Sequence, residues 1–101
     1  MKQSCKDYLM EQFGDEDVVC EIYAEYVKSI REKIPEIEAA LTSENWSSLD
    51  PLSHAVKGNA LASGDPDMAD AAIALRVAAK MEEKDTARTL VGKMKEFAKE
   101  L

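Results

Sequence analysis

Apolar side chains recur every third or fourth residue from Val19 to Leu41, which is the spacing of an amphipathic α-helix of roughly six turns. The stripe consists of Val19, Ile22, Tyr26, Ile30, Ile34, Ile37 and Leu41. Asp15 can cap the start of this helix. Pro35 lies inside the stripe and removes one backbone donor, but the apolar positions stay in phase beyond it. One long helix with a kink near residues 31–35 is therefore predicted.

Three other segments also have helical spacing. A short helix over residues 4–13 is expected to end at Gly14. A helix of small apolar residues follows Asp65 and Pro66, which suit a cap and a first helical position. Asp85 opens the last helix, whose apolar positions have the three-and-four spacing of a bundle seam. These positions are Ala87, Leu90, Met94, Phe97 and Leu101.

The start of the remaining helix is ambiguous in the sequence. Its apolar stripe consists of Trp46, Leu49, Leu52, Val56 and Ala60. Either Ser43 or Asn45 caps a helix that tolerates a distortion at Pro51, or Asp50 is the cap and Pro51 is the first helical residue. Because proline is favoured at the first helical position, the second arrangement is predicted for the regular part of the helix.

Four long amphipathic helices with short connections predict an all-α fold, an antiparallel up-and-down four-helix bundle with the short N-terminal helix packed across it. With 101 residues the chain has room for one domain, over residues 1–101.

Charge and composition narrow the classes of function. The formal net charge is -7, so a nucleic-acid partner is not expected, and no cluster of Lys and Arg suits a membrane surface. The longest apolar run near the N-terminus is too short for a secretory signal or a transmembrane helix, which makes the cytoplasm the expected location. Cys5 and Cys20 lack CxxC spacing and there is only one histidine, so reduced thiols and no metal site are expected.

The only histidine, His54, carries the functional hypothesis. A step of 100° per residue places it about 160° from Leu52 and Val56, so it points away from the core. A neutral imidazole is a nucleophile near neutral pH without a dedicated base. Lys57, one turn on, can offset the negative charge of a phosphoryl group. Gly58 costs about 1 kcal/mol relative to alanine in an exposed helix, which indicates that another protein approaches there.

Each of these residues also has a simpler explanation. A solitary exposed histidine is commonly a polar surface residue, and lysine one turn away is frequent on any solvated helix. The glycine within the helix favours the functional hypothesis over this one. Leu61, also on the outward face, is the apolar contact that a protein partner would use.

The segment from His54 to Ala60, HAVKGNA, followed by Gly64, resembles the HxLKG signature of the histidine-containing phosphotransfer (HPt) domain. The likeness runs from about residue 15 to the end, with an acidic, proline-containing helix, a tryptophan eight residues before the histidine and two further helices. Three positions depart from the family pattern, namely Pro51, Ser53 and Ser63.

The resemblance implies that His54 accepts a phosphoryl group from the aspartyl phosphate of a receiver domain and passes it to another receiver. Lys57 would stabilise the phosphoryl group and Gly58 would leave clearance for the receiver. No ATP-binding motif is visible, so the chain is expected to be a phosphotransfer intermediate and not an autonomous kinase. It would bind no cofactor itself, and the Mg²⁺ needed for transfer would lie in the acidic pocket of the receiver.

The leading hypothesis is a stand-alone, monomeric phosphorelay intermediate of a bacterial two-component pathway. Its partners would be response-regulator receiver domains, with a hybrid histidine kinase as a further candidate. The alternative is a non-catalytic adaptor, a bundle that binds a receiver or a helical partner without being phosphorylated. A metal- or cofactor-binding bundle ranks last, because the paired Glu-x-x-His motifs of such a core site are missing.

Overall fold

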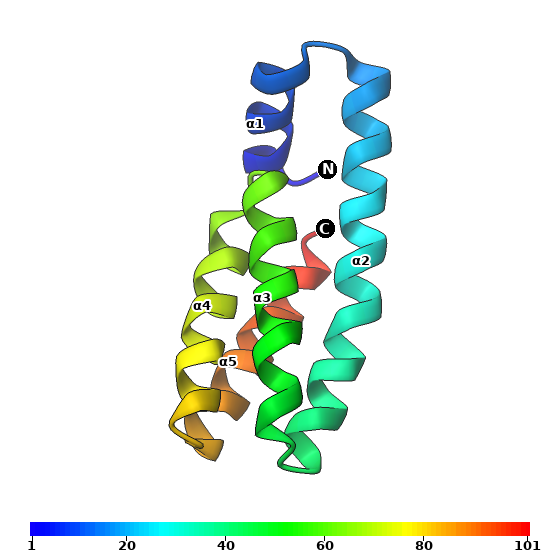
Figure 1. Ribbon diagram of the computed structural model, residues 1–101. Coiled ribbons are helices and arrows are strands. Elements are labelled where there is room, and N and C mark those ends of the chain that lie inside the picture. Colours follow the sequence, from blue (N-terminus) through cyan, green and yellow to red (C-terminus); the bar gives the residue numbers. More distant parts are fainter.

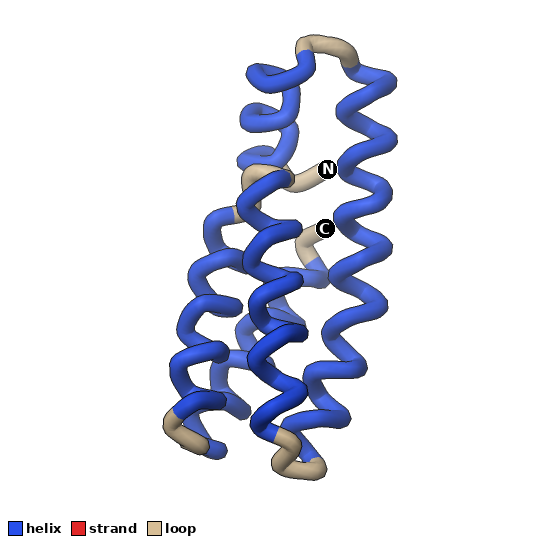
Figure 2. The backbone as a smooth tube through the Cα atoms, viewed as in Figure 1, coloured by secondary structure: helices blue, strands red, loops and turns tan.

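The computed structural model describes residues 1–101 and contains five α-helices and no strand (Figure 1). The helices are α1 (Gln3–Phe13), α2 (Glu16–Thr42), α3 (Trp46–Ala62), α4 (Pro66–Lys80) and α5 (Lys84–Lys99). Helices α2 to α5 are joined by short turns (Figure 2), each packs on the next, and α5 closes the ring against α2. The predicted all-α, antiparallel four-helix bundle is confirmed. None of the five helices is long and apolar enough to cross a membrane.

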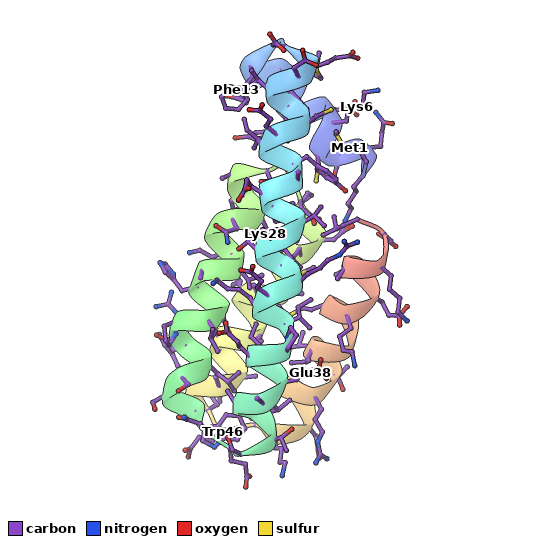
Figure 3. All side chains as sticks on the ribbon, turned by 90° about the vertical axis from the view of Figure 1, so that its right-hand side faces the viewer. Met1, Lys6, Phe13, Lys28, Glu38 and Trp46 are labelled. Carbon is purple, nitrogen blue, oxygen red and sulfur yellow. The ribbon has the colours of Figure 1, made fainter.

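The first helix lies at the end of the bundle and not across it, so the predicted packing of this helix is wrong. The reason is length, because α2 has 27 residues and its partners have 15 to 17. The N-terminal turns of α2 project beyond the other three helices, and α1 packs alongside them as the other arm of a hairpin (Figure 1). Figure 3 shows Phe13 near this end of the molecule and Trp46 at the opposite end.

The predicted helix boundaries at three positions are confirmed. Gly14 follows α1 with a φ of 68°, a left-handed conformation that favours glycine. The Asp15 carboxylate accepts hydrogen bonds from two backbone N–H groups in the first turn of α2, which continues without interruption through Pro35. Asp65 accepts from the N–H of Met68 at the start of α4.

Helix α3 begins at Trp46, not at Pro51, so the predicted start of this helix is wrong. The side chain of Asn45 is the cap and accepts from the N–H of Ser48 at 3.3 Å. Leu49, in the first turns, is fully buried, and its burial favours helix ahead of Pro51. The proline is exposed, so the carbonyl that loses its donor one turn earlier, that of Ser47, can be solvated. The alternative start at Asn45 is therefore the one observed.

One carboxylate lies in the interior near the α3–α4 turn. Asp65 is fully buried, and its oxygens accept from the hydroxyl of Tyr26 at 2.6 Å and from Nζ of Lys2 at 2.7 Å. A buried charge needs such partners, because an unpaired one would lose its hydration without compensation. The network ties the residues before α1 and the middle of α2 to the first turn of α4.

Candidate functional site

His54 lies in the middle of α3 and is exposed, as the spacing of the sequence predicts. Its ring contacts the neighbouring helix, because Nη1 of Arg76 on α4 lies 3.2 Å from Nδ1 of the imidazole. The outward-facing part of α3 around the ring is therefore the flank that borders α4.

Arg76 is itself held by an acidic residue of α3. Its Nε donates a hydrogen bond of 2.6 Å to Oδ1 of Asp50, one turn before His54. This hydrogen bond holds the pKa of the Asp50 carboxyl below its usual range, so the carboxylate stays ionised at neutral pH. The prediction that Asp50 is a helix cap is therefore wrong. Asp50 is instead the acceptor of an ion pair between α3 and α4.

Sequence reasoning did not find Asp50 and Arg76 as parts of the site. The pair forms between helices, and the periodicity of one helix does not report on its neighbour. One signal could have indicated it. In an antiparallel hairpin, residues at similar distances from the turn lie side by side, and Arg76 follows Gly64 by about as many residues as His54 precedes it.

Lys57 and Leu61 extend the exposed flank by one and two turns. Lys57 is half-buried and takes part in none of the salt bridges of the structure, so its ammonium is available to a partner. Leu61 is 53% exposed. With His54, these residues bring a nucleophile, a cation and an apolar contact onto one side of α3.

The packing of the bundle gives no reason for a glycine at position 58. A Cβ added to Gly58 would have no atom within 4 Å, and the residue lies in the regular part of α3. Gly64 is different, because it has a φ of 73° and a Cβ there would overlap the side chain of Tyr8 on α1. Gly64 is thus required by the fold, whereas Gly58 leaves open space beside His54.

The site around His54 lies outside the main hollows of the molecule. None of the five main hollows of the molecule is lined by His54, and no group of three or more His, Cys, Asp or Glu side chains could hold a metal ion. Small ligands bind mainly in concave sites that bury most of their surface. An exposed side chain in the middle of a helix suits contact with a second protein better than the enclosure of a small ligand.

Residues 21–101, most of the chain, match the family model of the Hpt domain. The chain belongs to the Hpt domain family, whose members have a phosphotransfer role in two-component systems and interact with receiver domains. The resemblance given by the segment around His54 is therefore confirmed at the level of the family. No curated protein and no solved structure matches the chain significantly.

Proposed function

We propose that this protein is a phosphorelay intermediate in which His54 accepts a phosphoryl group from the aspartyl phosphate of one receiver domain and passes it to another. The observation that carries the proposal is the position of the only histidine, exposed in the middle of α3 beside the open space at Gly58. A ring nitrogen forms a bond to phosphorus as the phosphorus–oxygen bond to the aspartate breaks, and the electron pair leaves on the carboxylate.

Lys57 has the position to assist this step. Charge is spread over the three oxygens of the phosphoryl group during transfer, and an ammonium one turn from the ring offsets it. The Mg²⁺ that transfer needs would be held by the acidic pocket of the receiver, so we assign no cofactor to this chain. The phosphoryl group comes from a receiver and not from ATP, which makes the protein an intermediate and not an autonomous kinase.

The receiver is proposed to dock on a surface made of His54, Lys57, Gly58 and Leu61 of α3, with Ile73 of α4 beside them. We call this set the docking surface. Leu61 and Ile73 are 53% and 45% exposed and would supply the apolar contacts around a polar centre. One copy of the chain holds every residue of the surface, so a monomer suffices for the reaction.

The receivers are proposed to be response regulators or the receiver of a hybrid histidine kinase, met in the cytoplasm. The test is to incubate the purified protein with a phosphorylated receiver and Mg²⁺, and then to locate phosphate by mass spectrometry at neutral pH. The native protein should carry acid-labile, base-stable phosphate on His54 that moves to a second receiver, and His54→Gln should carry none. Receiver binding that is equal in both proteins and leaves no phosphate on either would establish the adaptor instead.

A further inference from the structure

Arg76 bridges the imidazole of His54 and the carboxylate of Asp50. The guanidinium donates from Nε to Asp50 at 2.6 Å, and its Nη1 lies 3.2 Å from Nδ1 of the ring. Because Asp50 and His54 are one turn apart on the same helix, both lie within reach of one planar side chain from α4. The ion pair with Asp50 fixes the direction in which the Nη1–H group points.

Which partner donates in this hydrogen bond determines which nitrogen of the neutral ring carries the proton. A guanidinium has only donors, so Nδ1 of His54 must be the acceptor and must carry the lone pair. A neutral imidazole then has its proton on Nε2. The nitrogen that can act as a nucleophile is the unprotonated one, and in this arrangement it is covered by Arg76. Nε2, on the opposite side of the ring, has no free lone pair. Neither nitrogen is ready to attack phosphorus.

We propose that Arg76 is a positioning residue, anchored by Asp50, that keeps His54 in the unreactive Nε2–H tautomer until a phosphorylated receiver docks. The inference rests on the phosphorelay role proposed above. The charge of the incoming phosphoryl group draws Nη1 away from the ring, while Asp50 retains Nε. Water then carries the proton from Nε2 to Nδ1, and the lone pair of Nε2 becomes available.

The transfer step balances without a further acid or base. The lone pair of Nε2 forms the nitrogen–phosphorus bond as the bond from phosphorus to the receiver's aspartate breaks, and that electron pair leaves on the carboxylate. The ring keeps its proton on Nδ1. A neutral imidazole and a dianionic phosphoryl group therefore become a phosphoimidazolium with one net negative charge and a free carboxylate with the other.

Lys80 provides a matched comparison for Arg76. It is the next cation along α4 on the same side, and its charge also helps to lower the pKa of Asp50, so it lies close to the same carboxylate. No hydrogen bond joins Lys80 to the imidazole, whereas Arg76 has one. A neutral residue at position 80 changes the local charge without changing the donor to Nδ1.

The tautomer can be measured directly, because His54 is the only histidine and a tag-free ¹⁵N-labelled sample shows a single imidazole in long-range ¹H–¹⁵N NMR spectra. The native protein should be in the Nε2–H form. Arg76→Met should lower the ratio of Nε2–H to Nδ1–H about fivefold, the effect of losing one hydrogen bond. Arg76→Glu, whose carboxylate accepts from Nδ1–H, should make Nδ1–H the main form, and Lys80→Met should leave the native ratio.

The same tautomer ratio in the native and Arg76→Met proteins would overturn the proposal, whether or not phosphoryl transfer occurs. A ratio that also changes in Lys80→Met would overturn it too, because local charge and not the donor would then set the tautomer. If the ratio follows Arg76 but the native protein takes no phosphate from any receiver, tautomer control stands and the phosphorelay role fails.

Discussion

The hydroxyl of Tyr26, in the middle of α2, donates a 2.6 Å hydrogen bond to the fully buried carboxylate of Asp65 at the start of α4. The two residues are 39 positions apart in the chain, and Asp65 lies in the α3–α4 turn as the N-cap of α4. The bond supplies a buried charge with one of its few donors, and so makes the position of the α4 N-terminus depend on α2.

Loss of this hydroxyl should destabilise the protein. Tyr26→Phe should lower the free energy of unfolding by about 1.5–3 kcal/mol, the range for hydrogen bonds to charged groups. Tyr8→Phe is the control, because the Tyr8 side chain is partly exposed and its hydroxyl, unlike those of Tyr23 and Tyr26, makes no hydrogen bond, so its loss should change the free energy of unfolding by less than about 0.5 kcal/mol. Urea unfolding followed by circular dichroism gives both values. Equal changes in the two variants would show that the hydrogen bond from Tyr26 to Asp65 does not stabilise the protein.

Stability should fall at alkaline pH. Burial and the Asp65 carboxylate raise the pKa of the Tyr26 phenol well above its ordinary value of about 10. Above a pH of about 10 the phenol of Tyr26 loses its proton in the unfolded chain but keeps it in the folded protein. The unfolded state therefore binds fewer protons, and the free energy of unfolding decreases as the pH rises.

Lys2 adds to this trend. Burial lowers the pKa of its ammonium, but the hydrogen bonds and charges of Asp65 and Asp67 more than compensate, and the pKa is raised overall. Stability from Lys2 is thus also present below its ordinary pKa and lost at higher pH. Urea unfolding at pH values from about 8 to 11 should show a decline above about 10 that is less steep in Tyr26→Phe. Parallel curves for the two proteins would contradict the assignment.

Gly58 and Gly92 allow the clearance for a receiver to be tested. Both are exposed, both lie inside helices, and an added Cβ would have no atom within 4 Å at either. Gly58→Gln and Gly92→Gln should each stabilise the free protein by up to about 1 kcal/mol. Only Gly58→Gln should weaken receiver binding, by about tenfold or more. Titration calorimetry and thermal unfolding separate the two effects, and equal receiver affinities would remove Gly58 from the docking surface.

Lys57 should matter for transfer more than for binding. Lys57→Met keeps much of the half-buried stem but removes the ammonium, so phosphoryl transfer to His54 should slow about tenfold or more. Lys28→Met, on the exposed face of α2, is the control and should transfer at the native rate. Rapid-quench kinetics at saturating receiver measure this step. A variant that transfers normally at saturation but binds more weakly would make Lys57 a docking residue only.

Gly64 should be required for the fold. Gly64→Ala places a Cβ at a φ of 73° and against Tyr8, so it should cost more than Gly14→Ala, which has a similar φ and only an ordinary contact. The backbone term is about 1–2 kcal/mol in both, and the overlap adds about 1–3 kcal/mol at position 64. Tyr8→Ala should restore part of that excess in a double-mutant cycle. No coupling between the two positions would contradict the contact.

The helices of the bundle could be predicted because each has an apolar stripe that records its own buried face. The stripe from Val19 to Leu41 becomes α2, and the outward position of His54 follows from the same 100° step. The predicted start of α3 was wrong because the preference of proline for a first helical position contributes less free energy than the burial of Leu49. The predicted position of α1 was wrong because the apolar stripe of a long helix does not show which of its ends the neighbouring helices leave uncovered.

The candidate site also has one part that the sequence predicts and one part that it does not. Lys57, Gly58 and Leu61 share one helix with His54, and the spacing of the sequence brings them together on its exposed side. Their roles stay proposals. Arg76 reaches the ring from another helix, and its position depends on the register between α3 and α4, which is set by packing across the whole interface.

The exposed position of His54 on a single helix also affects the order of events in the proposed relay. A single ring presented on one docking surface can serve only one receiver at a time, so donor and acceptor must visit in turn and never together. Transfer would then follow ping-pong kinetics, in which an excess of the unphosphorylated acceptor delays loading by occupying the surface. The relative abundance of the two receivers, and not only their affinities, would set how fast a signal passes through this protein.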